Sequence, residues 1–332
     1  MLANNNEAII NKLAKNSVKT NKKQYAILFF TIILSAFMLF CVFTIGMTYL
    51  DSSRLQNTRL NGAEYDILTM NGFTSEQLNT LRQNENIRSV GIESYAGFIQ
   101  STEYDKTVEI GLLWCDEVFW DNLMSPARTK LDGHYPQNKN ELMVTKDILK
   151  TCGNENLSVG DSLILTYENN TGVYTDEFII SGIWDGYGDT SAGFVSKAFY
   201  DETGYDLKND GILCIKLNRN YVFPATIQSI EKSLDFSDRQ IFAPTGYIEN
   251  SFKLLLGICG LALVICLSAY LLIYNILYLS VSGKIRYYGL LQSLGMTKKQ
   301  LVHFIIKQMI LVGILGIFIG NLLGIILCMK LV

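Results

Sequence analysis

The sequence contains few of the residues on which catalytic motifs depend. It has two histidines, four prolines and three tryptophans among 332 residues. The histidines, His134 and His303, stand far apart, and there is no H-E-x-x-H pair, no G-x-S-x-G elbow and no P-loop. We therefore expect no enzyme activity, no catalytic residue, no metal site and no cofactor. Any work driven by ATP then requires a second polypeptide.

The cysteines follow no metal-binding or redox spacing, because no C-x-x-C pair and no Cys/His cluster occurs. Four of the seven lie in apolar runs, namely Cys41, Cys259, Cys266 and Cys328. Three lie in the polar middle of the chain, namely Cys115, Cys152 and Cys214. These three are either buried free thiols, which the sequence favours, or include a disulfide.

Acidic residues are nearly absent from both ends of the chain. Between residues 51 and 249 there are 30 acidic and 16 basic residues, whereas the remaining segments hold one acid, Glu7, and 12 bases. An acidic middle suits a hydrated domain and argues against binding of nucleic acid, which requires basic residues.

Three long apolar runs dominate a chain that is 49% hydrophobic. Residues 25–50 and 254–280 contain no charged residue, and residues 305–329 contain only Lys307. Each run exceeds the roughly 20 residues that cross a hydrocarbon core. No small-residue cleavage site follows the first run, so it is a retained span and not a signal peptide.

Lysine and arginine near the spans predict the orientation. Five lysines precede the first span, and Lys284, Arg286, Lys298 and Lys299 lie between the second and the third without any acid. Both segments should therefore face the cytoplasm, and the acidic middle should lie outside. We expect a multi-pass protein of the cell membrane, in contact with the lipid bilayer, with a cytoplasmic N-terminus and an extracytoplasmic large domain.

The predicted organisation follows from these runs. A cytoplasmic N-terminal segment (1–24) precedes the first span (25–50), and an extracytoplasmic domain (51–252) separates it from the second (253–280). A cytoplasmic coupling segment (281–302) leads to the third span (303–329). Ile9, Ile10, Leu13 and Val18 have helical spacing between lysines. This spacing favours an amphipathic helix on the inner leaflet over a disordered basic tail.

The middle of the chain alternates short β-rich runs with turn-rich stretches. We expect strands at residues 65–69, 108–113, 141–145, 162–167, 177–184 and 212–217. Helices are expected at residues 74–84, where Thr74 and Gln77 have capping-box spacing, and at residues 221–234. The fold class is thus a membrane protein with three transmembrane α-helices and a large α+β domain between the first and the second.

Several turns in this domain resemble one known family. The stretch DGHYPQNKNELMVT at residues 132–145, V-G-D at 159–161 and S-G-I at 181–183 are similar to the outer domain of the FtsX-like (MacB-like) ABC transporter permeases. The resemblance implies a domain of the MacB-like periplasmic core type.

The connection between the second and third spans contains KIRYYGLLQSLGMTKKQL at residues 284–301, which resembles the same family more specifically. Gly295 should end one helix, and Thr297 can cap the next. The resemblance implies a cytoplasmic ATP-binding ABC subunit as partner, which we expect to contact Lys284, Arg286, Gly289, Leu291, Leu294, Gly295, Lys298, Lys299 and Gln300.

Small residues recur every fourth position in the third span, at Gly316, Gly320 and Gly324. This spacing permits close helix packing, either between two copies or halves of the permease or within one subunit. Asn275 and Asn321 lie inside spans and can form hydrogen bonds across such contacts.

The family resemblance implies a permease subunit that transmits ATPase-driven conformational change to the outer domain. Its task would be export or extraction of a peptide, lipoprotein or drug, or signalling. The alternatives are a division-type regulator of an extracellular cell-wall hydrolase, without transport, and a transmembrane receptor. Family members have at least a fourth span, so we expect this chain to be an N-terminal half or a truncated member.

Overall fold

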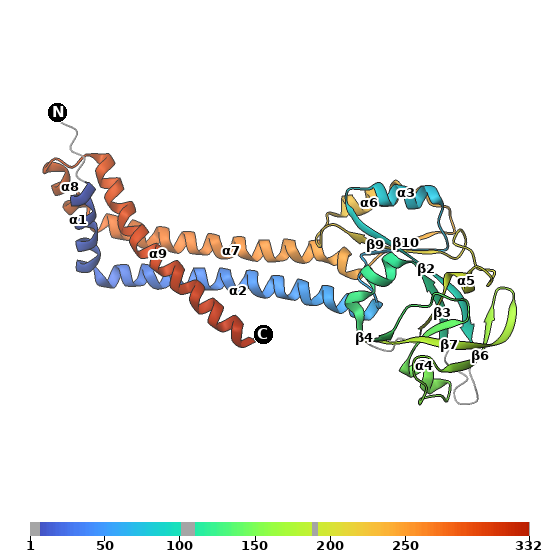
Figure 1. The fold of residues 1–332 in the computed structure, drawn as a ribbon. Coiled ribbons are helices and arrows are strands. Elements are labelled where there is room, and N and C mark those ends of the chain that lie inside the picture. The colour runs from blue at the N-terminus through green and yellow to red at the C-terminus, as the bar shows by residue number, and fades with distance from the viewer. Residues whose placement is uncertain (1–6, 101–109, 188–191, 332) are drawn as a thin grey trace. The chain divides into compact units, whose positions relative to one another are not determined.

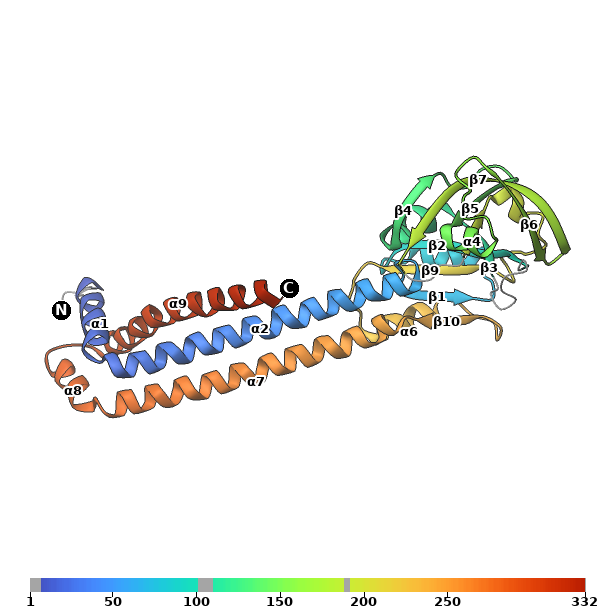
Figure 2. The same ribbon diagram turned by 90° about the horizontal axis from the view of Figure 1, so that it is seen from below.

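The computed structural model describes residues 7–100, 110–187 and 192–331. The chain divides into two compact units. The helix unit comprises Met1–Leu50 and Leu254–Val332, and the sheet unit comprises Asp51–Lys253. Figures 1 and 2 show the elements of each unit.

Within the described residues, three helices, whose apolar parts lie in the helix unit, are long and apolar enough to cross a membrane. They are α2 (Lys22–Asn61), α7 (Gly246–Ser282) and α9 (Lys298–Leu331). The three long apolar helices expected from the sequence are confirmed. Each helix is longer than its apolar run, because helical hydrogen bonding does not depend on apolar side chains.

The N-terminal helix α1 (Glu7–Thr20) packs against protein. Its Ile10 and Ala14 are buried in a cluster with Tyr288 of α8 (Ile285–Ser293) and Phe304 of α9. The helical spacing therefore predicted the element correctly. The sequence suggested that the apolar face lies on the inner leaflet. In the structure this face instead packs against α8 and α9.

The sheet unit is built around one mixed ten-stranded sheet with the order β10-β1-β9-β2-β3-β8-β5-β7-β4, in which β6 pairs with β2 and β7. The β3–β8 and β5–β7 pairs are parallel and the others are antiparallel. The strands are β1 (Ile67–Met70), β2 (Ile87–Ile99), β3 (Ile110–Cys115), β4 (Arg128–Gly133), β5 (Glu141–Thr145), β6 (Ser162–Asn169), β7 (Gly172–Gly186), β8 (Ala192–Val195), β9 (Ile212–Leu217) and β10 (Ile241–Pro244).

Short helices accompany the sheet: α3 (Ser75–Gln83), α4 (Lys146–Thr151), α5 (Lys197–Tyr200) and α6 (Pro224–Lys232), with the single turns Val118–Leu123 and Ser125–Ala127. The α+β fold class is thus confirmed. Cys115 and Cys214 are buried free thiols, and burial raises the pKa of both well above the ordinary value. Cys152 is a free thiol that is half-buried.

Four strands were not predicted from the sequence, and each omission has an identifiable reason. The long β2 contains Gly91 and Gly97 and has irregular pairing near Ile87 and Tyr95, which breaks a simple alternation. The edge strand β4 is mostly exposed and charged, β8 is only four residues long, and β10 ends in Pro244. The expected start of β3 at Val108 lies outside the described residues.

A hydrogen-bonded amide pair joins the two ends of the sheet unit's chain. Thr74 and Gln77 form the expected capping box of α3. The Gln77 amide also donates to the Leu234 carbonyl at 2.8 Å, and the Gln240 amide donates to the Gly72 carbonyl at 2.8 Å. Segments about 160 residues apart are thereby connected.

We predict that Gln77→Ala lowers the free energy of unfolding of the sheet unit by about 1–3 kcal/mol, because a buried carbonyl loses its donor. All three tryptophans lie in this unit, so tryptophan fluorescence during denaturation of the whole chain reports on it. Gln83→Ala, at the exposed end of α3, is the control and should change the transition little. Equal effects of both substitutions would contradict the assigned role of Gln77.

Candidate functional site

The two histidines occupy separate units and have local partners. His134 is exposed, with Nδ1 3.0 Å from the Tyr135 carbonyl, and His303 Nε2 lies 3.9 Å from a Glu7 carboxylate oxygen. Within the residues that the structure describes, no group of three or more His, Cys, Asp or Glu side chains could hold a metal ion. We take the segment around α8, where the sequence predicts the ATPase contact, as the candidate site.

The turn after α8 is built from local capping. Gly295 has φ +101°, a left-handed conformation that glycine adopts without strain, and the Gly295 N–H donates to the Gln292 carbonyl. At the start of α9, Thr297 Oγ1 accepts from the Gln300 N–H, and Gln300 Oε1 accepts from the Thr297 N–H. This capping box connects α8 and α9 by a well-defined turn.

One face of α8 is anchored in the helix unit. Tyr288 is 8% exposed and packs in the cluster with Ile10, Ala14 and Phe304, and Leu291 packs against the same cluster. This packing connects α8 to both α1 and α9.

The other face of α8 is open and combines apolar with basic groups. Leu294 is 77% exposed, and Ile285 and Leu290 are more than half exposed. Large exposed apolar groups bordered by charge are typical of protein contact sites. We name this set the coupling surface: Ile285, Arg286, Leu290, Leu294, Lys298 and Lys299. Gly289 and Gly295 are exposed beside it.

Two residues expected at this surface lie elsewhere. Leu291 packs inward, as described above. The Lys284 ammonium is buried without a hydrogen-bond partner among the described residues and lies 5.6 Å from the centre of the Tyr25 ring. Burial lowers its pKa. The sequence could not separate Lys284 from Arg286, because both are basic residues of one short segment.

The glycine stripe of α9 packs against α2. A Cβ on Gly320 would lie 2.6 Å from the Ile33 carbonyl oxygen, and one on Gly324 would overlap the Phe40 ring. Gly316 meets Ile32 in the same way. In this structure the stripe therefore serves packing within one chain, where the sequence left packing between copies open.

The two asparagines of the spans differ in exposure. Asn321 of α9 is half-buried, and Asn275 of α7 is exposed. Among the described residues, the polar link between α2 and α9 that the structure shows is the hydrogen bond from the Tyr25 hydroxyl to the Gln308 side chain.

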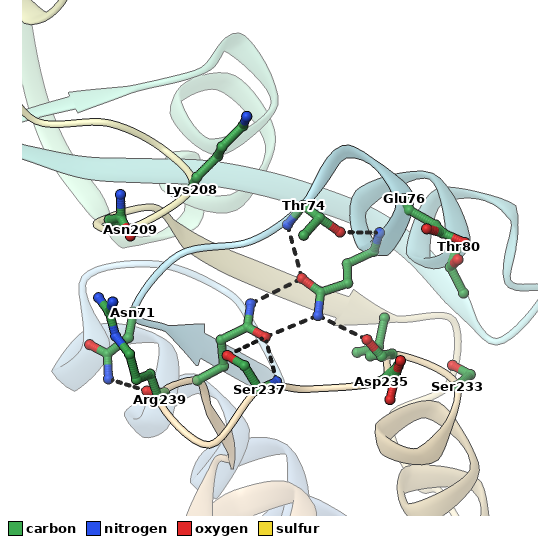
Figure 3. A pocket seen from close by; sticks show the side chains of 13 residues that line it. Asn71, Thr74, Glu76, Thr80, Lys208, Asn209, Ser233, Asp235, Ser237 and Arg239 are labelled. Carbon is green, nitrogen blue, oxygen red and sulfur yellow. Dashed lines mark hydrogen bonds between the residues drawn. The ribbon is translucent and has the colours of Figure 1, made fainter.

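The sheet unit has a polar hollow of about 360 Å³, which Figure 3 shows between α3 and the segment that follows α6. Glu76, Asp235, Lys208 and Arg239 are among its lining residues, so the lining carries both signs of charge. Gln77 and Gln240 also line it, and their side-chain amides are hydrogen-bonded to each other.

Residues 259–331 match the model of a family described as FtsX-like permease C-terminal. This part of the chain is similar to the FtsX-like permeases. The resemblance expected from the sequence is thus confirmed. The matched residues include most of α7 and all of α8 and α9, and therefore the entire coupling surface.

Two solved structures are similar at low identity. One is the periplasmic region of MacB from Actinobacillus actinomycetemcomitans, with TM-score 0.38, 12% identity, and coverage of 58% of this chain and 95% of that chain. The other is the extracellular domain of the noncanonic ABC-type transporter YknZ from Gram-positive bacteria, with TM-score 0.35, 12% identity, and coverage of 54% and 98%. No curated protein matches significantly in sequence.

We predict that Gly320→Ala lowers the thermal midpoint of the purified chain and weakens the contact between α2 and α9, because its Cβ meets backbone atoms that cannot move aside. Gly313→Ala is the matched control in the same helix, since nothing lies within 4 Å of a Cβ there. The midpoint can be followed by size-exclusion chromatography after heating. A Gly320→Ala chain as stable as Gly313→Ala would contradict the close packing.

Proposed function

We propose that this chain is the permease subunit of an ABC-type complex and that it passes ATPase-driven conformational change across the membrane to the sheet unit. The observation that carries the proposal is the coincidence of the FtsX-like segment with the coupling surface. The chain itself then hydrolyses nothing, and a separate cytoplasmic subunit binds and hydrolyses ATP.

The packing of α8 supports such a transmission. Its inner face is fixed to α1 and α9, and only Gly283 and Lys284 separate it from the end of α7. An ATPase that docks on Leu290 and Leu294 and pairs with the basic residues can thus displace α8, α7 and α9 together. The exposed leucines supply apolar contact area, and the cations supply orientation.

The orientation of the proposed complex rests on charge. The lysines of α1 and the basic residues beside α8 belong on the cytoplasmic side by the positive-inside rule, where the ATPase lies. The acidic sheet unit then lies outside the cell membrane. There it would act in export or extraction of a peptide, lipoprotein or drug, or in signalling.

Labelling of an engineered cysteine checks this orientation. Asp238→Cys lies at an exposed position of the sheet unit and should react with a membrane-impermeant maleimide in intact cells. Lys299→Cys, beside α8, should react only after lysis. The unsubstituted chain measures the background from the native cysteines. Protection of Asp238→Cys until lysis would overturn the orientation.

Charge reversal at the coupling surface tests the function itself. We predict that Arg286→Glu combined with Lys298→Glu reduces co-purification of the ATPase from membranes by roughly tenfold or more, because attraction becomes repulsion at the contact. The co-purified ATPase activity should fall in parallel, while the amount of chain in the membrane stays constant.

The matched control is Lys130→Glu combined with Lys150→Glu, which makes the same charge change at exposed positions of the sheet unit. This variant should bind the ATPase normally. If both double variants retain the ATPase and its activity, the coupling surface does not have the proposed role.

A further inference from the structure

Asp66 is a buried acid between the end of α2 and the start of β1. Its side chain is 2% exposed, and the Lys216 side chain of β9 is 5% exposed. Lys216 Nζ lies 3.2 Å from Asp66 Oδ2 and 3.1 Å from Glu64 Oε1. The buried Lys216 ammonium therefore forms ion pairs with two carboxylates.

Hydrogen bonds connect Asp66 to β9 on both sides of Lys216. The Asp66 N–H donates to the Ile215 carbonyl at 2.9 Å, and Asp66 Oδ2 accepts from the Leu217 N–H at 2.9 Å. Strand β9 lies between β1 and β2 in the sheet, so these bonds hold Asp66 to an interior strand.

Asp66 also forms a hydrogen bond with the residue that precedes α7. Its carbonyl accepts from the Thr245 N–H at 2.8 Å. Thr245 immediately precedes α7, and its own carbonyl accepts from the Glu249 N–H in the first turn. The first turns of α7 are well packed in the sheet unit, since Ile248 is 1% exposed and Ser251 is fully buried.

The end of α2 reaches the same group through Glu64. Arg54 Nη1, in the last part of α2, lies 4.0 Å from Glu64 Oε1, the oxygen that also contacts Lys216. Two further residues near this end are fixed in the sheet unit. Thr58 is 4% exposed, and the Arg59 guanidinium carbon lies 4.1 Å from the centre of the Tyr187 ring.

A buried ion pair is a poor means of stabilising a core. Apolar residues of the same volume often stabilise a protein equally well, because removing two charges from water is costly. Burial raises the pKa of Asp66, while Lys216 and the Leu217 N–H act in the opposite direction. What the pair provides is a directed contact that fixes several elements in one arrangement.

We propose that Asp66, Lys216, Glu64 and Arg54 form a clamp that makes the end of α2 and the start of α7 move together with strand β9. The clamp rests on the proposed function, because it specifies where motion of the membrane helices enters the sheet unit. Asp66 and Lys216 act here as positioning residues and bind no ligand.

Hydrogen exchange of the full-length chain in lipid nanodiscs, without nucleotide, tests the clamp directly. In Lys216→Met, amides of residues 51–61 and of residues 246–253 should both exchange at least about tenfold faster than in the unsubstituted chain. Lys197→Met is the control, because it removes an exposed lysine that pairs with Asp201 on the surface. Its helix ends should exchange at the original rate.

Asp66→Asn provides a second variant that removes the charge and keeps an acceptor for the Leu217 N–H. It should loosen both helix ends in the same direction, so the test does not depend on one substitution folding well. If either variant folds and only β9 exchanges faster, the pair is a local element of the core and the clamp is wrong.

A second measurement separates the clamp from the proposed function. The complex purified with its ATPase is compared with and without a non-hydrolysable ATP analogue. A nucleotide-dependent change in β9 exchange should occur in the unsubstituted complex and be lost in Lys216→Met. An equal response in both overturns the clamp. No response in the unsubstituted complex refutes the proposed function, and the measurement without nucleotide still decides the clamp.

Discussion

The helices α2 and α7 continue past the length that a bilayer requires and each have one end within the sheet unit, and the other features depend on this continuity. About 20 residues cross a hydrocarbon core, whereas α2 has 40 residues and α7 has 37. Each helix contributes its remaining turns to the sheet unit, where Thr58, Ile248 and Ser251 are buried. Because helical hydrogen bonds are local, each helix passes from an apolar to a polar environment without interruption.

The interior of each unit is stabilised by different interactions. The sheet unit buries one large apolar core that includes Leu112, Leu142 and Phe178. In lipid, burial of apolar groups gives little advantage, so close approach and hydrogen bonds matter more. Gly320 against the Ile33 carbonyl, and Tyr25 bonded to Gln308, are contacts of this second kind. The clamp is of neither kind, because it places charged side chains in the interior of the sheet unit.

Short-range sequence patterns, such as apolar runs and capping spacings, were sufficient to predict much of this fold. The apolar runs predicted α2, α7 and α9, and the Thr74–Gln77 spacing predicted the start of α3. What a sequence pattern could not predict is which partner covers a given face. The apolar face of α1 suits a lipid surface and a protein surface equally, and only the fold shows that it meets Tyr288 and Phe304. Lys284 and Arg286 likewise are both positively charged, yet the Lys284 ammonium is buried and Arg286 is exposed.

The clamp could not be predicted from the sequence either, because its partners are far apart along the chain. Asp66 and Lys216 are 150 residues apart, and among the 59 charged residues of the chain neither stands out. The topology of the sheet brings them together, since β1 pairs with β9 on one side and with β10 on the other. Strand β10 leads into α7, and α2 leads into β1. A charge placed at the start of β1 therefore adjoins both helix ends.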